Sequence, residues 1–268
     1  MAIDSTIYAA DIPAGAYTTG DIIPMACIDG PANVRSGRSA AILKSIFIGM
    51  SANSSPCVFR VHVKNSDWID EVVTLATGTT NQTAIYSPDS GATQNGHDSI
   101  LTPNSSWDIY AECISGGTTT AATSVFALLD IDYPSVSSIQ VPAAVQGIPV
   151  SITMDAVVPV TADGAMIGST WTATSVDYLK AGYKYVLDKF EIVCSTQCVG
   201  FIAFSNAAGM GGLQRIIPFN GNTAGIRYPV KYSSPLVKGP MEVKFKLFGT
   251  AGSAGIWSVH DYVKKAIA

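Results

Sequence analysis

The chain has 268 residues, of which 47% are apolar and 13% charged, with a formal net charge of −4. This low charge and the mean hydropathy of +0.28 exclude an intrinsically disordered chain, which needs high charge and few apolar residues to stay solvated. Lys and Arg number 16 against 20 Asp and Glu, so there is no basic field to attract a phosphate backbone, and we expect no nucleic-acid partner. No apolar run approaches the ~18 residues that span a bilayer, and the N-terminus lacks a signal-peptide pattern. We therefore expect a soluble protein made in a cytoplasm, without a membrane partner.

Short apolar runs separated by clusters of Gly, Asn, Asp, Pro and Ser recur along the chain, which is typical of strands joined by turns. Turn dipeptides are predicted at Asn95-Gly96, Asp163-Gly164 and Asn220-Gly221. The one predicted helix covers residues 261–267. We count about sixteen candidate strands, of which the clearest are residues 42–48, 57–63, 107–114, 124–131, 150–158, 185–194, 199–204, 242–248 and 256–259. This pattern indicates an all-β fold of sandwich or jelly-roll type.

The predicted strand at residues 42–48 is apolar on both faces. Strict alternation places Leu43, Ser45 and Phe47 on the face opposite Ile42, Lys44, Ile46 and Ile48. We therefore expect this strand to be covered on both sides, by the second sheet and by a neighbouring domain or subunit.

A faint internal repeat links the two halves of the chain. Residues 42–48 match 186–192 in apolar pattern, and the same order is kept by 57–58 with 198–199, 107–109 with 241–243, and 125–126 with 256–257. The offset falls steadily from 144 to 131 residues, as loop insertions would make it. Any two all-β domains share period-two alternation, so coincidence is the alternative. With a linker composition at residues 133–138, the repeat predicts two tandem jelly-roll-like β-sandwich domains, residues 1–134 and 135–268.

Catalytic machinery is not evident, and we predict that the protein is not an enzyme. A hydrolytic triad needs a nucleophile, a base and an orienting acid, and none of the three histidines lies in a recognised motif. His62 stands between Val61 and Val63 in a predicted strand, so it should face solvent on the side opposite the valines. His97 and His260 have no partner that the sequence identifies.

The sequence also predicts no metal and no cofactor. Cys194 and Cys198 flank a three-residue turn that suits a disulfide or half a zinc site, but a structural zinc site needs a second ligand pair. We expect buried free thiols at the five cysteines, Cys27, Cys57, Cys113, Cys194 and Cys198. The loop at residues 209–212 lacks the Lys of a phosphate loop, and residues 89–98 lack a calcium-binding pattern. Sequons at Asn53, Asn81 and Asn104 are unsurprising in a chain this rich in Ser and Thr.

The N-terminal third resembles the opening of a group of small β-sandwich virion proteins from tailed bacteriophages. The resemblance lies in Asp21-Ile22-Ile23, in the Gly- and Ser-containing segment 30–39, in the I-L-K-S-I pattern of residues 42–46, and in the strand at 57–63 that follows. It covers about residues 20 to 65 and includes no catalytic motif, and the second half of the chain lacks the Gly-Ser-Arg lead-in. The resemblance implies a capsid decoration or cement protein, located in the virion and bound to neighbours in the capsid lattice.

Two other functions remain open at this point. A double jelly-roll major capsid protein that forms trimeric capsomers would suit the strand count and the duplication. A carbohydrate-binding β-sandwich module would need exposed aromatic side chains, but Trp68, Trp107, Trp171 and Trp257 are dispersed, and Trp107 and Trp257 belong to predicted strands, where core packing is expected.

Self-association is expected from the low charge, because an isolated chain would expose more apolar surface than soluble monomers tolerate. We predict a homotrimer, since a closed ring satisfies heterologous interfaces, with each interface above roughly 1,000 Å². The polar loops around Asn81, Asn95 and Asn104 are the expected outer rim.

Overall fold

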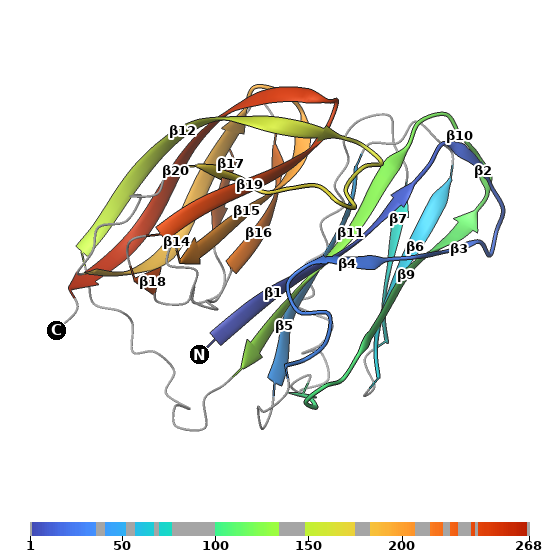
Figure 1. Cartoon of the computed structure of the whole chain (residues 1–268), viewed down its shortest axis with the longest axis horizontal. Coiled ribbons are helices and arrows are strands. Elements are labelled where there is room, and N and C mark those ends of the chain that lie inside the picture. Colours follow the sequence, from blue (N-terminus) through green and yellow to red (C-terminus); the bar gives the residue numbers. More distant parts are fainter. Residues whose placement is uncertain are drawn as a thin grey trace.

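The computed structural model describes residues 2–35, 41–51, 57–66, 70–76, 100–133, 148–174, 183–206, 215–221, 226–229, 237–238 and 241–266. In this part of the chain all regular elements are β-strands, so the all-β prediction is confirmed (Figure 1). Each of the nine clearest predicted strands corresponds to an observed strand. The described segments contain no helix long and apolar enough to cross a membrane.

The first half of the chain forms a β-sandwich, here called the N-terminal sandwich. Its two sheets enclose a core in which Ile46 and Ile48 of one sheet face Phe59 and Val61 of the other. Strands β2 (Gly15–Tyr17) and β10 (Gly117–Thr119) form a separate short ribbon. The larger sheet consists, in order across it, of β4 (Ala26–Asp29), β1 (Ala2–Ile12), β11 (Thr123–Tyr133), β5 (Ala41–Met50) and β8 (Ile100–Leu101). The smaller sheet consists, in order, of β3 (Ile22–Pro24), β9 (Trp107–Ser115), β6 (Val58–Asn65) and β7 (Asp70–Ala76).

The second half, the C-terminal sandwich, is one nine-stranded sheet that curls back on itself. Its two layers join where β12 pairs in parallel with β19 over only three residues, Val160 to Ala162. Its core lies between β12, β20 and β14 on one side and β15, β16 and β19 on the other. The order of strands across this sheet is β16 (Arg215–Gly221), β15 (Cys198–Asn206), β19 (Met241–Gly249), β12 (Ile148–Ala162), β20 (Gly252–Ala266), β14 (Tyr183–Cys194) and β17 (Ile226–Pro229). Two short strands complete it: β13 (Thr172–Thr174) pairs with β19, and β18 (Val237–Lys238) pairs with β14.

The two sandwiches share one strand plan. The order β1-β11-β5 is repeated by β12-β20-β14, and the order β3-β9-β6-β7 is repeated by β13-β19-β15-β16. The register agrees as well: Arg60 lies opposite Glu112, and the residues aligned with them by the sequence repeat, Phe201 and Lys246, also lie opposite each other. The topology therefore agrees with the predicted internal duplication. The predicted boundary after residue 134 and the linker at 134–138 lie outside the described residues.

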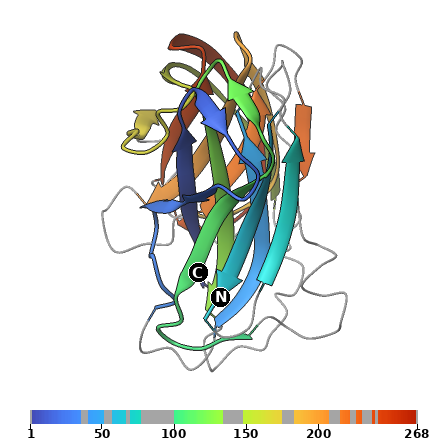
Figure 2. The same ribbon diagram turned by 90° about the vertical axis from the view of Figure 1, so that its right-hand side faces the viewer.

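The two sandwiches stack into four layers with a third hydrophobic core between the inner layers (Figure 1). Ile7 of β1 and Phe126 of β11 pack there against Phe201 of β15 and Phe248 of β19. Because successive side chains of a strand point to opposite faces, β1 and β11 contribute to the first core with one face and to the third with the other. The outer layers are therefore the β3-β9-β6-β7 sheet, which faces the viewer in Figure 2, and the β12-β20-β14 layer.

Two-sided burial of the strand at residues 42–48 is confirmed for the side chains that the structure describes, Leu43, Ile46, Phe47 and Ile48, but strict alternation within this strand is wrong. Leu43 and Ile46 both lie in the first core, whereas Phe47 packs against the third. The reason is a β-bulge: Leu43 pairs with Ile131 and Ser45 with Asp130, so Lys44 is an extra residue that shifts the alternation.

Two other local predictions are also wrong. Residues 261–266 continue strand β20 rather than forming a helix, because all of them pair with β14 on one side and residues 261–264 also pair with β12 on the other. A helix of seven residues is marginal alone, and the paired strand satisfies both edges. Asn220 and Gly221 are the last residues of β16, paired with Val199 and Cys198, and not a turn. The turn at Asp163-Gly164 is confirmed, with Gly164 at φ +78°.

Candidate functional site

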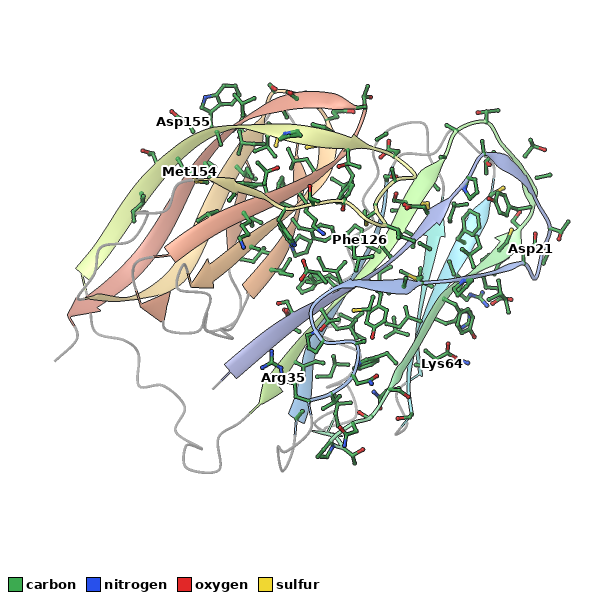
Figure 3. The ribbon with its side chains drawn as sticks, viewed as in Figure 1. Asp21, Arg35, Lys64, Phe126, Met154 and Asp155 are labelled. Carbon is green, nitrogen blue, oxygen red and sulfur yellow. The ribbon has the colours of Figure 1, made fainter. Side chains whose placement is uncertain are left out.

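The contact between the two sandwiches shows which kinds of sheet face pack together in this protein. Phe126 and Phe201 meet edge to face with ring centroids 4.7 Å apart, and both side chains are fully buried. Phe126 lies in the middle of the molecule, between the sandwiches (Figure 3). Such aromatic pairs contribute about 0.5–1.5 kcal/mol beyond the burial of their surface.

Polar contacts fix the register of this internal interface. The Asp11 carboxylate accepts hydrogen bonds from the backbone N–H groups of Met166 (2.7 Å) and Ile167 (2.8 Å) and from the Ser124 hydroxyl (2.7 Å). Nearby, the Ser5 hydroxyl donates to Asp130 at 2.6 Å and accepts from the backbone N–H of Ile216. These bonds tie the two halves in one orientation.

A buried cation lies at the edge of the same interface. The Lys246 ammonium is 4.0 Å from the Asp29 carboxylate and 5.0 Å from the centre of the Trp171 ring, whose Nε1–H donates to Asp29. Burial lowers the pKa of Lys246, and the charge of Asp29 partly offsets this effect. The half-buried Trp171 is thus a structural residue of the interface rather than an exposed platform.

The outer surface of the β12-β20-β14 layer is exposed, and we call it the Trp257 face. Trp257 is 49% and Val157 is 74% exposed, so the prediction that Trp257 lies in the core is wrong. The face consists of the outward residues Thr153, Asp155, Val157, Glu191, Val193, Gly255 and Trp257. Asp155 lies on this outer side, away from the N-terminal sandwich (Figure 3).

The Trp257 ring occupies space that is open because Gly255 has no side chain. A Cβ atom at Gly255 would lie 2.9 Å from the Trp257 ring, so the indole lies back along its own strand over this glycine. The backbone of Gly255 is itself fixed, because its N–H donates to the Ser195 hydroxyl (2.8 Å) and its carbonyl accepts from the Ser195 N–H (2.9 Å). The indole is therefore a supported, exposed surface.

The opposite end of the stack presents a more polar surface, the Arg60 face. The His62 Nε2 atom lies 2.9 Å from Glu112, and its ring stacks on Tyr110 at 4.6 Å. Lys64 lies 5.6 Å from the centre of the Tyr110 ring. His62 points away from the buried Val61 and Val63, as predicted, but its side chain is only 13% exposed and does not face solvent freely, because it stacks on Tyr110 and pairs with Glu112. The face consists of the outward residues Ile22, Val58, Arg60, His62, Lys64, Asp108, Tyr110, Glu112 and Ile114.

These two outer faces are the counterparts of the two faces that pack inside the chain. The sequence repeat aligns Phe126 with Trp257, and Phe201 with Arg60. Sheet order and register agree with this alignment. Periodicity alone could not show that one copy of each face is covered by the other sandwich while the second copy is bare, meaning here that no described element packs on it, because that depends on the stacking of the halves.

The five cysteines form no disulfide, and four of them are buried as predicted, while Cys27 is half-buried. Cys194 ends β14 and Cys198 begins β15, and both are fully buried. The Cys198 thiol hydrogen-bonds to the Cys194 sulfur, which lowers the pKa of Cys194, whereas this bond and burial raise the pKa of Cys198. The turn between β14 and β15 thus places the two thiols where they interact with each other.

Other residues considered in the sequence contribute little to a site. Among the described residues, no group of three or more His, Cys, Asp or Glu side chains is arranged to hold a metal ion. Asn104 is exposed in a turn, with φ +68°. Outside the described residues lie Asn53, Trp68, Asn81, Asn95, His97 and the segments 89–98 and 209–212.

No protein-family model and no curated protein sequence matches the chain. Solved structures similar to it include the PBSX exported protein XepA (9% identity, TM-score 0.23, covering 94% of this chain and 86% of that one). Another is broad bean stain virus (11% identity, TM-score 0.26, covering 100% of this chain and 90% of that one). A third is the empty top-component particle of cowpea mosaic virus (11% identity, TM-score 0.25, covering 100% of this chain and 92% of that one). These three are an exported protein and two virus particles, and a CBM22 tandem domain from Paenibacillus barcinonensis Xyn10C also matches (8% identity, TM-score 0.17, covering 99% of this chain and 94% of that one). At these TM-scores the likeness carries no argument about function.

Proposed function

We propose that this protein is a structural component of a virion, a capsid decoration or cement protein that self-associates and binds the lattice of a tailed-phage head. The observation that carries the proposal is the pair of bare outer faces, each the counterpart of a face that is buried within the chain. A protein with two such faces is suited to contacts on both sides. The N-terminal resemblance to phage virion proteins points to the same role.

The architecture supports a mechanical task. Three hydrophobic cores join four layers, and β1 and β11 are buried on both faces, so the two halves are joined by continuous apolar packing. The role that we propose for the chain is non-enzymatic. Assembly as a homotrimer remains the expected form, and a major capsid protein remains the structural alternative.

The test of the proposal is the assembly state of the purified chain. Light scattering should give a mass near three times the 28.0 kDa of one chain, and electron microscopy should show the protein on phage heads incubated with it. A monodisperse monomer of 28.0 kDa that does not bind phage heads would contradict the proposal.

A carbohydrate-binding module is the second candidate, and the exposed Trp257 favours it. A flat indole supported by Gly255 and flanked by the carboxylate of Asp155 can stack on a pyranose ring while the carboxylate accepts a hydroxyl hydrogen bond. A glycan array would decide the matter: binding by the wild-type chain that Trp257→Ala abolishes, without loss of thermal stability, supports this candidate over the virion role.

A further inference from the structure

We propose that copies of this chain associate head to tail, with the Trp257 face of one copy packed on the Arg60 face of the next. The inference rests on the proposed self-association and names the surfaces that carry it. The chain contains the template for the contact, because its own two sandwiches pack in this way. A second copy added in the same sense would continue the four-layer stack, so this contact joins copies in series and differs from the closed ring expected of a homotrimer (Figure 1).

The template follows from the duplication. Within the chain, the β1-β11-β5 layer of the N-terminal sandwich packs on the β19-β15-β16 layer of the C-terminal sandwich. The counterparts of these layers, β12-β20-β14 and β9-β6-β7, are the two outer layers of the same chain. Each copy therefore carries one bare face of each kind, at opposite ends, which is the arrangement that a heterologous interface requires.

The central residues of the internal interface have suitable counterparts on the outer faces. Phe126 packs on Phe201 inside the chain, so the same geometry between copies places Trp257 on Arg60. A guanidinium group over an indole is a favourable cation–π contact, and Trp and Arg are the side chains most enriched at the energetic centres of interfaces.

The charges around these two residues are complementary. Asp155 lies directly opposite Trp257 on β12, and Glu191 lies two residues from Val193, the position opposite Trp257 on β14. On the other face, Arg60 is followed along β6 by His62 and Lys64. The carboxylates of that face, Asp108 and Glu112, stand on the neighbouring strand β9, and Glu112 is bound by His62. The carboxylates beside Trp257 thus meet Arg60 and Lys64, although Glu112 and Asp108 of β9 lie directly opposite these two basic residues within the Arg60 face.

The contact between copies should be weaker and more sensitive to salt than the contact within the chain. Where the internal interface has the apolar pair Ala9 and Ala203, the outer faces have Asp155 and His62 at the aligned positions. Exposed charges are screened by salt, whereas a dry apolar core is not. The polar substitutions also keep the bare faces soluble before assembly.

Two single-face variants test the inference. D155K/W257A alters the Trp257 face and leaves the Arg60 face intact, and R60E does the reverse. T250E, an exposed charge change in the turn between β19 and β20, is the control. Far-UV circular dichroism and thermal unfolding establish that each variant is folded. We expect each single-face variant alone to be a monomer of 28.0 kDa, and an equimolar mixture of the two to form dimers that cannot extend.

The outcomes separate this inference from the proposed function. Monomeric variants, mixed dimers and a wild-type and T250E assembly that high salt dissociates support the head-to-tail contact. Wild-type assembly that both single-face variants retain, or a mixture that stays monomeric, overturns the contact and leaves the proposed virion role standing. A wild-type chain that is itself monomeric and does not bind phage heads overturns both.

Discussion

Lys44 in β5 and Asp188 in β14 occupy the same position in the two sandwiches: each is an extra residue with no partner on the neighbouring strand. The residues on either side of Lys44 lie opposite consecutive residues of β11, and those on either side of Asp188 lie opposite consecutive residues of β20. The sequence repeat aligns these two positions at an offset of 144 residues. A shared bulge is stronger support for duplication than shared strand order, because bulges are conserved features of a family rather than a general property of β-sheets.

The bulge at Lys44 decides which side chains of β5 enter the first core. Deleting Lys44 restores strict alternation and moves Leu43, which is 4% exposed, to the other face of the sheet. We expect a loss of about 3 kcal/mol or more in the free energy of unfolding, the typical cost of removing a buried Leu. Urea denaturation measures this, and Lys44→Ala, which keeps the chain length, should lose much less. Equal stability of the deletion variant and the wild type would show that the register is not fixed by the bulge.

Asp11 joins the two halves through backbone donors. In Asp11→Ala the N–H groups of Met166 and Ile167 lose their acceptor, and each orphaned donor costs about 1–3 kcal/mol where it is shielded from water. We expect a lower unfolding free energy by about 2–4 kcal/mol for this variant. Asp11→Asn retains one acceptor oxygen, so its free energy of unfolding should lie between those of the wild type and Asp11→Ala. A denaturation curve for Asp11→Ala that matches the curve of the wild type would mean that the stability of the interface does not depend on this carboxylate.

The strands and their pairing into halves could be predicted from the sequence, because strand periodicity and turn residues are local properties. The duplication was also visible, since Cys57-Val58 and Cys198-Val199 hold the same place in each half. The exposure of Trp257 could not be predicted, because Phe126 occupies the aligned position and is fully buried. What separates them is the stacking of the two sandwiches, a long-range property that leaves no periodic pattern.

The predicted helix at residues 261–267 failed for a related reason. The segment looks helical locally, but in the structure residues 261–266 pair with β14 and residues 261–264 also pair with β12. Tertiary pairing therefore overrides local propensity at the end of β20.

Asp163 should make stability at neutral pH lower than it would be with a neutral side chain. Burial raises the pKa of its carboxyl, an effect that the hydrogen bond from Ser51 reduces, and its Oδ1 atom is buried without a partner. Because the folded pKa is above the unfolded value, the penalty is full above the folded pKa and disappears as pH falls through it towards the unfolded value. Asp163→Asn should therefore be more stable than the wild type at pH 7, and the difference should shrink on acidification.

The measurement for Asp163 is the unfolding free energy of both proteins from pH 7 down to about 4, near the unfolded pKa of Asp. Taking the difference between the two proteins removes the contributions of the other carboxyl groups. A difference that is constant with pH would contradict the raised pKa, and a variant less stable than the wild type at pH 7 would show that the charged carboxylate is favourable at this turn.

Cys194 and Cys198 should form a disulfide when the native protein is oxidised. Their sulfurs are already in hydrogen-bond contact, and Cys194 has the lower pKa, so its thiolate is the expected nucleophile towards hydrogen peroxide. Attack gives a sulfenic acid and one water, and the Cys198 thiol then displaces the second water; two thiols are oxidised and one peroxide is reduced.

The tryptic peptide of residues 190–215 contains only these two cysteines, so the bond can be read as the loss of two hydrogens and as protection from alkylation after denaturation in acid. Closing so short a loop should raise the melting temperature of the wild type by about 4–8 °C. The variant C194S/C198S should show no such rise. The variant C27S, which lacks the more accessible thiol, should behave like the wild type. Complete alkylation of the peptide after peroxide treatment, or pairing of either cysteine with another thiol, would show that the contact does not favour this bond.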